Sequence, residues 1–465
     1  MQFLLFGTGD YYQRYKMWFN RSDIVALLDN SRLKQHTVLD GIEVMSPEEG
    51  VKLSYDAVVI LSFYVRTMKE QLVSLGVLEQ KIYHFYDLPY LLQKKERRAV
   101  TWYGGGQQIF HGKAEGGRVL LLSQELTLGG PPIALFHAAR VLKKNGHDVV
   151  YASMIDGPLR KMLVENGIPV VVDNNLQICF LREITWLHGF SLIICNTINF
   201  HNFLTERSGG TPIIWWLHDA PFFYDGIRKE HLAKIAGDRL RVVSVGPIPK
   251  EAMHRFLPSL PIGELLYGVA DQEGAMRQVL AGRKMRLVTI GFFEDIKGQD
   301  VLLEAISLLP DGWKRQIELF LVGHDATLFA EQLKAAYTMP DCVRYTGSLD
   351  RKQVHKILQQ ATLLICPSRQ DSMPTVAAEA MMHGVPCLVS DAVGTAAYIR
   401  HGEDGLVFPS GDVQALRDQI AWCIGHRAQV EAMGHKAREL YLREFSMETF
   451  ERNFMHLVDE VQKGR

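Results

Sequence analysis

Short apolar runs separated by longer stretches of mixed character recur along the chain. In the first part of the chain they are QFLLF at 2–6, IVALLD at 24–29, DAVVILS at 56–62 and KIYHFYDL at 81–88. Runs of this kind predict strands of a parallel sheet, with helices in the segments between them. We therefore expect residues 1–92 to form a small Rossmann-like α/β domain.

The composition changes directly after this first domain. Residues 93–117 contain the charged run KKERR and then several glycines, with no apolar period. A segment of this composition cannot bury a core. It is predicted to be a linker.

The alternation of apolar and mixed segments resumes at residue 118 and continues nearly to the end of the chain. Residues 118–123 predict a strand, and 132–153 have a helix-like composition. Further strands are predicted at 169–173, 191–196, 212–219, 241–246 and 286–291. We expect two more α/β domains, at 118–271 and 284–445, followed by a C-terminal helix within 446–465.

Length and charge narrow the function classes. A chain of 465 residues is long enough for two or three domains. With 51 basic and 52 acidic residues, it has no excess charge that would attract nucleic acid. Its six cysteines are scattered and mostly lie in apolar runs, which is typical of reduced core residues.

No apolar run approaches the ~20 residues that a membrane-spanning helix needs, and the N-terminus lacks the basic start of a signal peptide. We therefore expect a cytoplasmic protein, and a peripheral contact with the inner face of the membrane stays open.

The stretch 366–391 carries the strongest chemical signal. An apolar strand leads into a loop with Asp371, and a short helix follows with Glu379 eight residues further on. Pro374 suits the first helical position. The backbone amides of the next three residues are then free to bind a phosphate, as helix N-termini do. They belong to Thr375, Val376 and Ala377.

Two other positions lie where α/β sheets bind ligands, at the carboxyl ends of strands. Gly129 and Gly130 stand between a strand and a helix, where glycine lets a ligand approach the backbone. His218 lies at the carboxyl end of the strand predicted at 212–219, within a group of aromatic residues. That group either packs in the core or lines an acceptor cleft.

Near the N-terminus, Gly7, Thr8 and Gly9 follow the first strand, and Asp29 closes the second. This is half of a dinucleotide-binding fingerprint, with Tyr12 in place of the third glycine. Such an incomplete motif more often marks a tight turn. We favour an accessory or partner-docking role for this domain, including oligomer formation, over cofactor binding.

The spacing of Asp371 and Glu379, together with EAMMHGVPCLVSD and VGTAAYIRHGEDGLVF, resembles the donor site of retaining glycosyltransferases of the GT-B fold, family 4. The resemblance covers roughly residues 118–463. It implies two Rossmann-like domains that face each other across a cleft, here preceded by the small α/β domain. Lys297 and Gly298 match the lysine and glycine of the family's second half.

The resemblance also implies roles for individual residues. Glu379 would hold the ribose of a nucleotide sugar, and Asp371 the sugar. Lys297 would stabilise the leaving diphosphate together with the amides near Pro374, Thr375 and Val376. His218 would complete the reaction side with Gly129 and Gly130. Gly347 and Leu349, with Ser348 between them, would border the base, and Gly323 would lie under the nucleotide.

Two positions depart from the family pattern. Asp371 stands where glutamate is more usual, and Phe292 where many members carry an arginine. The second change leaves open weaker catalysis, another donor, or a basic residue that reaches in from elsewhere.

The expected reaction is therefore transfer of a sugar from a nucleoside diphosphate to an acceptor hydroxyl with retention of configuration. The acceptor would be a surface polysaccharide, a glycolipid or a glycoprotein glycan. We expect no metal, because no D-x-D motif occurs. The resemblance implies no cofactor, since the nucleotide sugar is a substrate. The alternatives are a non-catalytic subunit that binds nucleotide sugars and, through the N-terminal domain, an NAD-dependent oxidoreductase.

Overall fold

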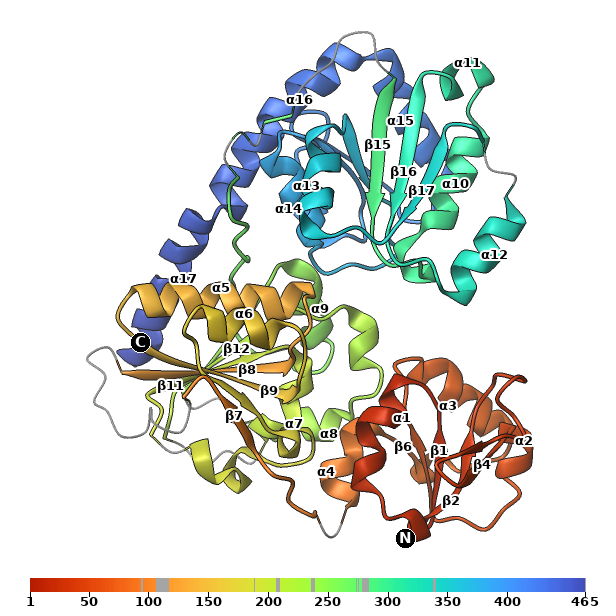
Figure 1. The fold of residues 1–465 in the computed structure, drawn as a ribbon, viewed down its shortest axis with the longest axis vertical. Coiled ribbons are helices and arrows are strands. Elements are labelled where there is room, and N and C mark those ends of the chain that lie inside the picture. Colours follow the sequence, from red (N-terminus) through yellow and green to blue (C-terminus); the bar gives the residue numbers. More distant parts are fainter. Residues whose placement is uncertain are drawn as a thin grey trace.

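The structure is a computed structural model that describes residues 1–92, 95–105, 117–187, 189–205, 210–235, 239–272, 274, 276–277, 284–337 and 340–464. Within these residues, three sheets organise the chain (Figure 1). We call the parts built on them the N-terminal unit (1–92), the central unit (95–272) and the C-terminal unit (284–464).

The N-terminal unit holds a sheet of order β3-β4-β2-β1-β5-β6, in which only the β3–β4 pair is antiparallel. The four strands that the sequence predicts in this unit, β1, β2, β5 and β6, are mostly buried, whereas β3 lies at the exposed edge of the sheet. The elements are β1 (Phe3–Phe6), α1 (Asp10–Tyr15), β2 (Ile24–Leu28), β3 (Val38–Leu39), β4 (Ile42–Met45), α2 (Pro47–Gly50), β5 (Ala57–Ile60), α3 (Val65–Ser74), β6 (Ile82–His84) and α4 (Leu88–Leu91).

The central unit holds a larger sheet of order β14-β13-β12-β11-β8-β9-β10-β7, parallel except for β7. The elements are β7 (Thr101–Tyr103), β8 (Arg118–Glu125), α5 (Gly130–Lys144), β9 (Asp148–Ile155), α6 (Leu159–Glu165), β10 (Val170–Val172), β11 (Leu192–Asn196), α7 (His201–Leu204), β12 (Ile213–Leu217), α8 (Lys229–Leu232), β13 (Leu240–Ser244), α9 (Pro247–His254) and β14 (Ile262–Glu264).

The C-terminal unit has a parallel sheet of order β17-β16-β15-β18-β19-β20. Its elements are β15 (Met285–Ile290), α10 (Gln299–Ser307), α11 (Asp311–Lys314), β16 (Ile317–Val322), α12 (Leu328–Ala336), β17 (Val343–Gly347), α13 (Arg351–Gln359), β18 (Leu363–Cys366), α14 (Thr375–Met382), β19 (Cys387–Ser390), β20 (Gly405–Phe408), α15 (Val413–Gly425), α16 (Arg427–Leu440) and α17 (Met447–Gln462).

Two sequence expectations are corrected by these elements. The predicted linker 93–117 contains strand β7, which pairs with β10 at the edge of the central sheet. Residues 93–94 and 106–116 of that linker lie outside the described residues. The helix-like segment 132–153 is a helix only to Lys144, because Asn145 and Gly146 end it and the following apolar run pairs with β8.

The central sheet shares each of its faces with a different neighbour. Side chains alternate along β8, so Val119 and Leu121 point to one face and Leu120 and Leu122 to the other. The first face joins a core that continues into α14 and α17. The second face joins a core that includes Phe85 of the N-terminal unit. Both neighbours are therefore anchored by apolar packing.

Helix α17 returns from the C-terminal unit to the central unit and lies against α5 (Figure 1). The apolar stripe that the sequence predicts is buried, at Phe450, Phe454, Leu457 and Val461. The ring of Phe450 stacks on Trp216 with centroids 5.8 Å apart. This confirms that the last helix packs on the first half of the pair.

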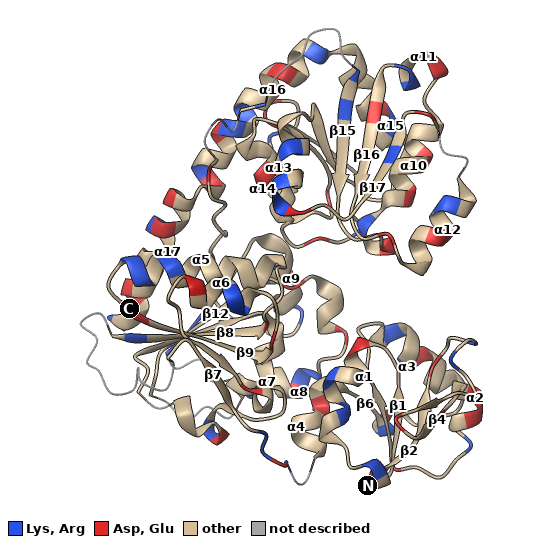
Figure 2. Ribbon diagram, viewed as in Figure 1, with Lys and Arg blue, Asp and Glu red and all other residues tan. Residues whose placement is uncertain are grey.

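Acidic and basic residues are interspersed over all three units, so no unit carries one sign of charge alone (Figure 2). All six cysteines are buried and none of them forms a disulfide, as expected from their apolar runs. Among the described helices, none combines the length and apolar character needed to cross a membrane.

A buried carboxylate lies at the carboxyl end of β12, directly after His218. The Asp219 Oδ2 atom accepts a hydrogen bond from the backbone amide of Ile198 at 2.6 Å. Burial raises the pKa of Asp219 to about 7, although backbone hydrogen bonds oppose this shift. Thr197, which precedes Ile198, has a φ of 74°, which is a strained conformation for a β-branched residue. The contact with Asp219 therefore helps to hold the strained segment at Thr197 and Ile198.

We expect Phe454→Ala to lower the free energy of unfolding by about 3–5 kcal/mol, because it opens a cavity at a fully buried position between α17 and the central unit. His456→Ala is the matched control on the same helix. The His456 side chain is 75% exposed, and its loss should change stability by less than about 0.5 kcal/mol. Urea denaturation of both variants checks this, and equal effects would contradict the packing described here.

Asp219→Asn should become more stable relative to the wild type as pH rises from about 4 to about 7. The raised pKa means that the folded wild type binds a proton more tightly than the unfolded chain. It thus loses stability across this range, by at most about 1.4 kcal/mol per pH unit. The asparagine does not titrate. Urea denaturation at several pH values measures the difference, and Asp418→Asn at an exposed carboxylate of α15 should follow the wild type.

Candidate functional site

A cleft of about 730 Å³ lies between the central and C-terminal units, at the carboxyl ends of their strands. Ten of the predicted residues line it, with members from both units. Those of the central unit are Gly129, Gly130 and His218. Those of the C-terminal unit are Gly323, Lys297, Leu349, Asp371, Pro374, Thr375 and Val376. The structure thus brings together side chains that are far apart in the sequence.

Lys297 stands on a short loop after β15 that is fixed by close backbone packing. Gly298, which follows it, has a φ of 67°, and a side chain there would begin 2.1 Å from the carbonyl oxygen of Pro367. Only glycine fits such an approach. Nearby, Arg369 makes hydrogen bonds of 2.8 and 2.6 Å to the two carboxylate oxygens of Asp300. The loops that carry Lys297 and Asp371 are therefore fastened to each other.

Lys297 and Asp371 form an ion pair inside the cleft. The Lys297 Nζ atom donates a hydrogen bond to Asp371 Oδ2 at 2.7 Å. Burial alone would lower the pKa of Lys297, but the charge and hydrogen bond of Asp371 outweigh it and raise this pKa. The lysine therefore stays positively charged, in surroundings where a charge acts more strongly than in water.

The first turn of α14 presents fewer amides to the cleft than expected. Pro374 is the N-cap and Thr375 is the first helical residue. The amide of Ala377 donates to the carbonyl of Pro374 at 3.1 Å, so it is not available for a ligand. The amides of Thr375 and Val376 remain without an acceptor in the described part of the chain, and both residues line the cleft.

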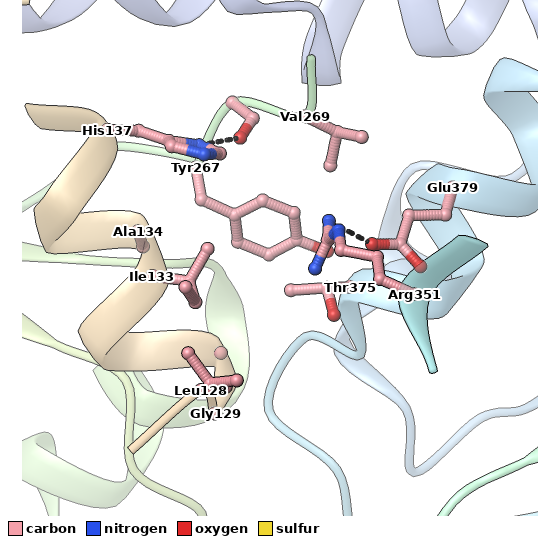
Figure 3. A pocket seen from close by; sticks show the side chains of 12 residues that line it. Leu128, Gly129, Ile133, Ala134, His137, Tyr267, Val269, Arg351, Thr375 and Glu379 are labelled. Carbon is pink, nitrogen blue, oxygen red and sulfur yellow. Dashed lines mark hydrogen bonds and ion pairs between the residues drawn. The ribbon is translucent and has the colours of Figure 1, made fainter. Parts of the chain in front are cut away.

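Glu379 lies in a narrow side pocket next to the cleft (Figure 3). Its side chain is buried, and its Oε1 atom accepts a hydrogen bond at 2.6 Å from Arg351, the first residue of α13. Burial raises the pKa of Glu379, and the charge of Arg351 opposes this. Gly129, Gly130 and Thr375 border this pocket as well as the main cleft.

The sequence did not point to Arg351 or to Tyr267, which both face this side pocket (Figure 3). The Tyr267 hydroxyl donates to the carbonyl of Pro374 at 3.1 Å and so ties the central unit to the start of α14. Neither residue belongs to a motif, because each acts through a contact between separate parts of the chain. The only signal for Arg351 was the missing cation at Phe292.

His218 is 8% exposed and packs against the ring of Trp216 at 4.5 Å. Burial lowers its pKa to about 3, so the ring is neutral near pH 7. Its Nε2 atom has no hydrogen-bond partner among the described residues. The same holds for Gln370 Oε1 and Ser372 Oγ, on the opposite wall. Buried polar atoms are rarely left unpaired, so the cleft is suited to a polar ligand.

Gly347 lies outside the lining of both pockets, and its carbonyl accepts a hydrogen bond from the amide of Gly323 at 3.0 Å. The neighbouring Leu349 and Ser348 do line the cleft. Phe292 lies at the cleft with its ring 62% exposed. Phe292 therefore supplies an apolar surface at the position where many members of the resembled family carry an arginine.

In the incomplete dinucleotide-binding motif of the N-terminal unit, the carboxylate of Asp29 is already bound by neighbouring residues. Asp29 accepts hydrogen bonds from the amides of Thr8 and Ser31 at 3.1 and 2.9 Å, and Lys34 lies 3.2 Å away. The carboxylate that would hold a ribose is thus engaged. In the described ranges, no group of three or more His, Cys, Asp or Glu side chains is placed to hold a metal.

Three family models match parts of the chain. Residues 272–440 match "Glycosyl transferases group 1", and residues 115–238 match "Glycosyl-transferase family 4". Residues 1–83 match "C2185-like, N-terminal". The matches to the two glycosyltransferase models fall on the C-terminal and central units, which form the two walls of the cleft.

Curated relatives match shorter stretches. An exopolysaccharide phosphotransferase of Streptomyces coelicolor is 37% identical over 23% of this chain and 11% of its own length. The N-acetyl-alpha-D-glucosaminyl L-malate synthase of Bacillus anthracis is 27% identical over 39% of this chain and 44% of its own length. The lipopolysaccharide glucosyltransferase WaaG of Escherichia coli is 26% identical over 37% and 42%. The chain spans less than half the length of these relatives.

Solved structures match over a longer part of the chain. The crystal structure of Anabaena HepE in complex with UDP and glucose has a TM-score of 0.60 and 17% identity, over 74% of this chain and 99% of that one. WaaG has a TM-score of 0.55 and 16% identity, over 72% and 98%. The protein therefore has the GT-B fold preceded by a small α/β unit, and its two GT-B halves match models of glycosyltransferase families.

Proposed function

We propose that this protein transfers a sugar from a nucleoside diphosphate to the hydroxyl of a glycan, glycolipid or glycoprotein acceptor, with retention of configuration. The observation that carries the proposal is the cleft between the two GT-B halves. One wall holds Lys297, Asp371 and the first amides of α14. The other holds His218 and residues 128–130, which we call the glycine loop. The Anabaena HepE complexes with UDP and UDP-glucose support a nucleotide sugar as the donor.

The ionised groups of the C-terminal unit have separate tasks in this proposal. Glu379 accepts hydrogen bonds from the ribose hydroxyls, which suits a carboxylate in a narrow pocket. Asp371 binds hydroxyls of the sugar. Lys297, with the amides of Thr375 and Val376, stabilises the negative charge that grows on the diphosphate as its bond to the sugar breaks.

The central unit completes the reaction side. His218 lines the cleft and is neutral, and its Nε2 atom has no hydrogen-bond partner among the described residues, so it is the proposed contact to a sugar hydroxyl. Gly129 and Gly130 let the donor approach the backbone at the start of α5. We assign no protein nucleophile. The leaving phosphate takes the acceptor proton while the acceptor oxygen attacks from the same face of the sugar.

We infer that Arg351 supplies the positive charge that Phe292 does not. It borders the same side pocket as the glycine loop and is already close to Glu379. A ribose bound at Glu379 would displace this ion pair. The guanidinium would then be free to meet the diphosphate, for which its planar set of donors is well suited.

The function is tested by measuring release of nucleoside diphosphate from UDP-, GDP- and dTDP-sugars with a panel of saccharide and lipid-linked acceptors. A donor at 100 times its Kd should add about 2.7 kcal/mol to stability, which a thermal shift detects before any acceptor is known. Binding without release over the whole panel would instead identify a non-catalytic sugar-nucleotide-binding subunit. NADH titration with no binding would remove the oxidoreductase alternative.

Lys297→Ala should lower kcat by about 10²–10³-fold, because one fixed charge at the developing phosphate is lost. Glu379→Ala should instead raise the donor Kd by about tenfold or more, through loss of charged hydrogen bonds to the ribose. Lys334→Ala, which breaks a lysine–aspartate pair of 2.6 Å on α12 outside the cleft, is the control and should leave both constants unchanged. Transfer that survives the first two changes would refute the assignment.

Arg351→Ala should weaken binding of UDP by about tenfold while changing the affinity for uridine much less. Titration calorimetry with both ligands measures this ratio. Arg351→Lys keeps the charge and should lie in between, and Lys352→Ala at the next exposed position should match the wild type. Tighter uridine binding by Arg351→Ala, with UDP unaffected, would mean that this arginine only blocks Glu379.

A further inference from the structure

A series of polar side chains connects helix α1 of the N-terminal unit to the glycine loop of the cleft. The Nη2 atom of Arg14 lies 3.0 Å from Glu125 Oε2, at the end of β8. The other carboxylate oxygen of Glu125 accepts a hydrogen bond from Thr127 Oγ1 at 3.1 Å. That hydroxyl in turn accepts one from the amide of Gly129 at 3.4 Å. We call this series the Arg14 relay.

Arg14 is itself held in place. Its guanidinium lies 5.1 Å from the ring centroid of Tyr11, as a cation over an aromatic face. The Tyr11 ring stacks on Phe85 with centroids 5.0 Å apart, and Phe85 is buried in the core shared by the N-terminal and central units. The start of the Arg14 relay is therefore fixed to that core.

The loop around Gly129 and Gly130 has few side chains of its own that could hold it in place. Leu128 is 55% exposed, and the next two residues have no side chains. At the same time the loop is close to the opposite wall, since a side chain added at Gly130 would begin 3.6 Å from Thr375 Cγ2. A shift of about 1 Å at such a place costs a positioned reaction about 10²-fold.

A second connection from the N-terminal unit reaches the loop behind His218. The Tyr86 hydroxyl donates to Asn199 Oδ1 at 2.8 Å, and Asn199 Nδ2 donates to the Thr197 hydroxyl at 3.2 Å. Thr197 is the strained residue next to the amide that Asp219 binds. The N-terminal unit thus contacts the supports of both predicted elements on the central wall of the cleft.

We propose that the N-terminal unit is a positioning domain for the central wall of the cleft, and that Arg14 acts on the Gly129 amide through Glu125 and Thr127. The predicted effect on turnover rests on the proposed transfer reaction. The predicted effect on the order of the glycine loop does not. Loss of Arg14 frees the glycine loop. The nucleotide-binding groups, which belong to the C-terminal unit, keep their places.

The test compares Arg14→Ala with Arg66→Ala in the full-length protein. Arg66 is a matched control, because it also joins the N-terminal and central units, through an ion pair of 3.0 Å with Asp225. Asp225 follows the short helix Pro221–Tyr224 and is not part of the loop that contains Gly129 and Gly130. In Arg14→Ala, hydrogen exchange of the backbone amides in residues 126–130 should rise about fivefold or more. In Arg66→Ala it should stay within about twofold.

Turnover and nucleotide binding are the second readout. In Arg14→Ala, kcat should fall about tenfold while the Kd for the nucleotide stays within about twofold. Arg14→Lys keeps the charge and should restore part of the lost kcat and part of the lost protection from hydrogen exchange. Thr127→Val breaks the Arg14 relay one step later, so adding it to Arg14→Ala should change little further.

Unchanged exchange at 126–130 in Arg14→Ala would overturn the proposal. An equal rise in Arg66→Ala would also overturn it, because the cause would then be a general loosening between the two units. If the wild type transfers no sugar, the proposed function fails, and the exchange comparison still decides whether the Arg14 relay orders the loop. Thermal unfolding of each variant establishes that it is folded.

Discussion

The structure depends on a central sheet whose two faces are both buried by neighbours. Strand β8 sends alternate apolar side chains into two cores, one continuous with the C-terminal unit and α17, the other with the N-terminal unit. A parallel sheet has to be covered on both faces. This requirement holds three units in fixed relation and places the carboxyl ends of the central strands opposite those of the C-terminal sheet.

The cleft that results has charged groups on its C-terminal wall, and the backbones behind that wall are closely packed. Glycines at 298 and 323 allow backbones to approach within distances that any side chain would prevent. The ion pair of Lys297 with Asp371 holds charges on side chains that are mostly buried, where a charge acts more strongly than in water. The proposed chemistry uses these charges on a sugar nucleotide, and the central wall contributes shape and neutral hydrogen-bonding groups.

Local signals predicted much of this. The apolar runs predicted most of the strands, and the resemblance to GT-B glycosyltransferases implied one shared cleft. Gly129, His218, Lys297 and Asp371 line this cleft, whereas Glu379 lies in a side pocket. The strand at 101–103 was missed, because its pairing partner β10 lies far along the chain. Arg351 was missed for the same reason. A cation that replaces another from a different helix leaves no trace in local spacing.

The return of α17 to the central unit has a consequence for synthesis. The stacking partner of Trp216 is Phe450, which is synthesised only after the central unit and the C-terminal sheet. Until then the nascent central unit presents an open apolar face, at a stage when chains are prone to misassembly. The N-terminal unit, which is made first, already covers the opposite face. The order of the units along the chain thus limits the exposed surface to one side during vectorial folding.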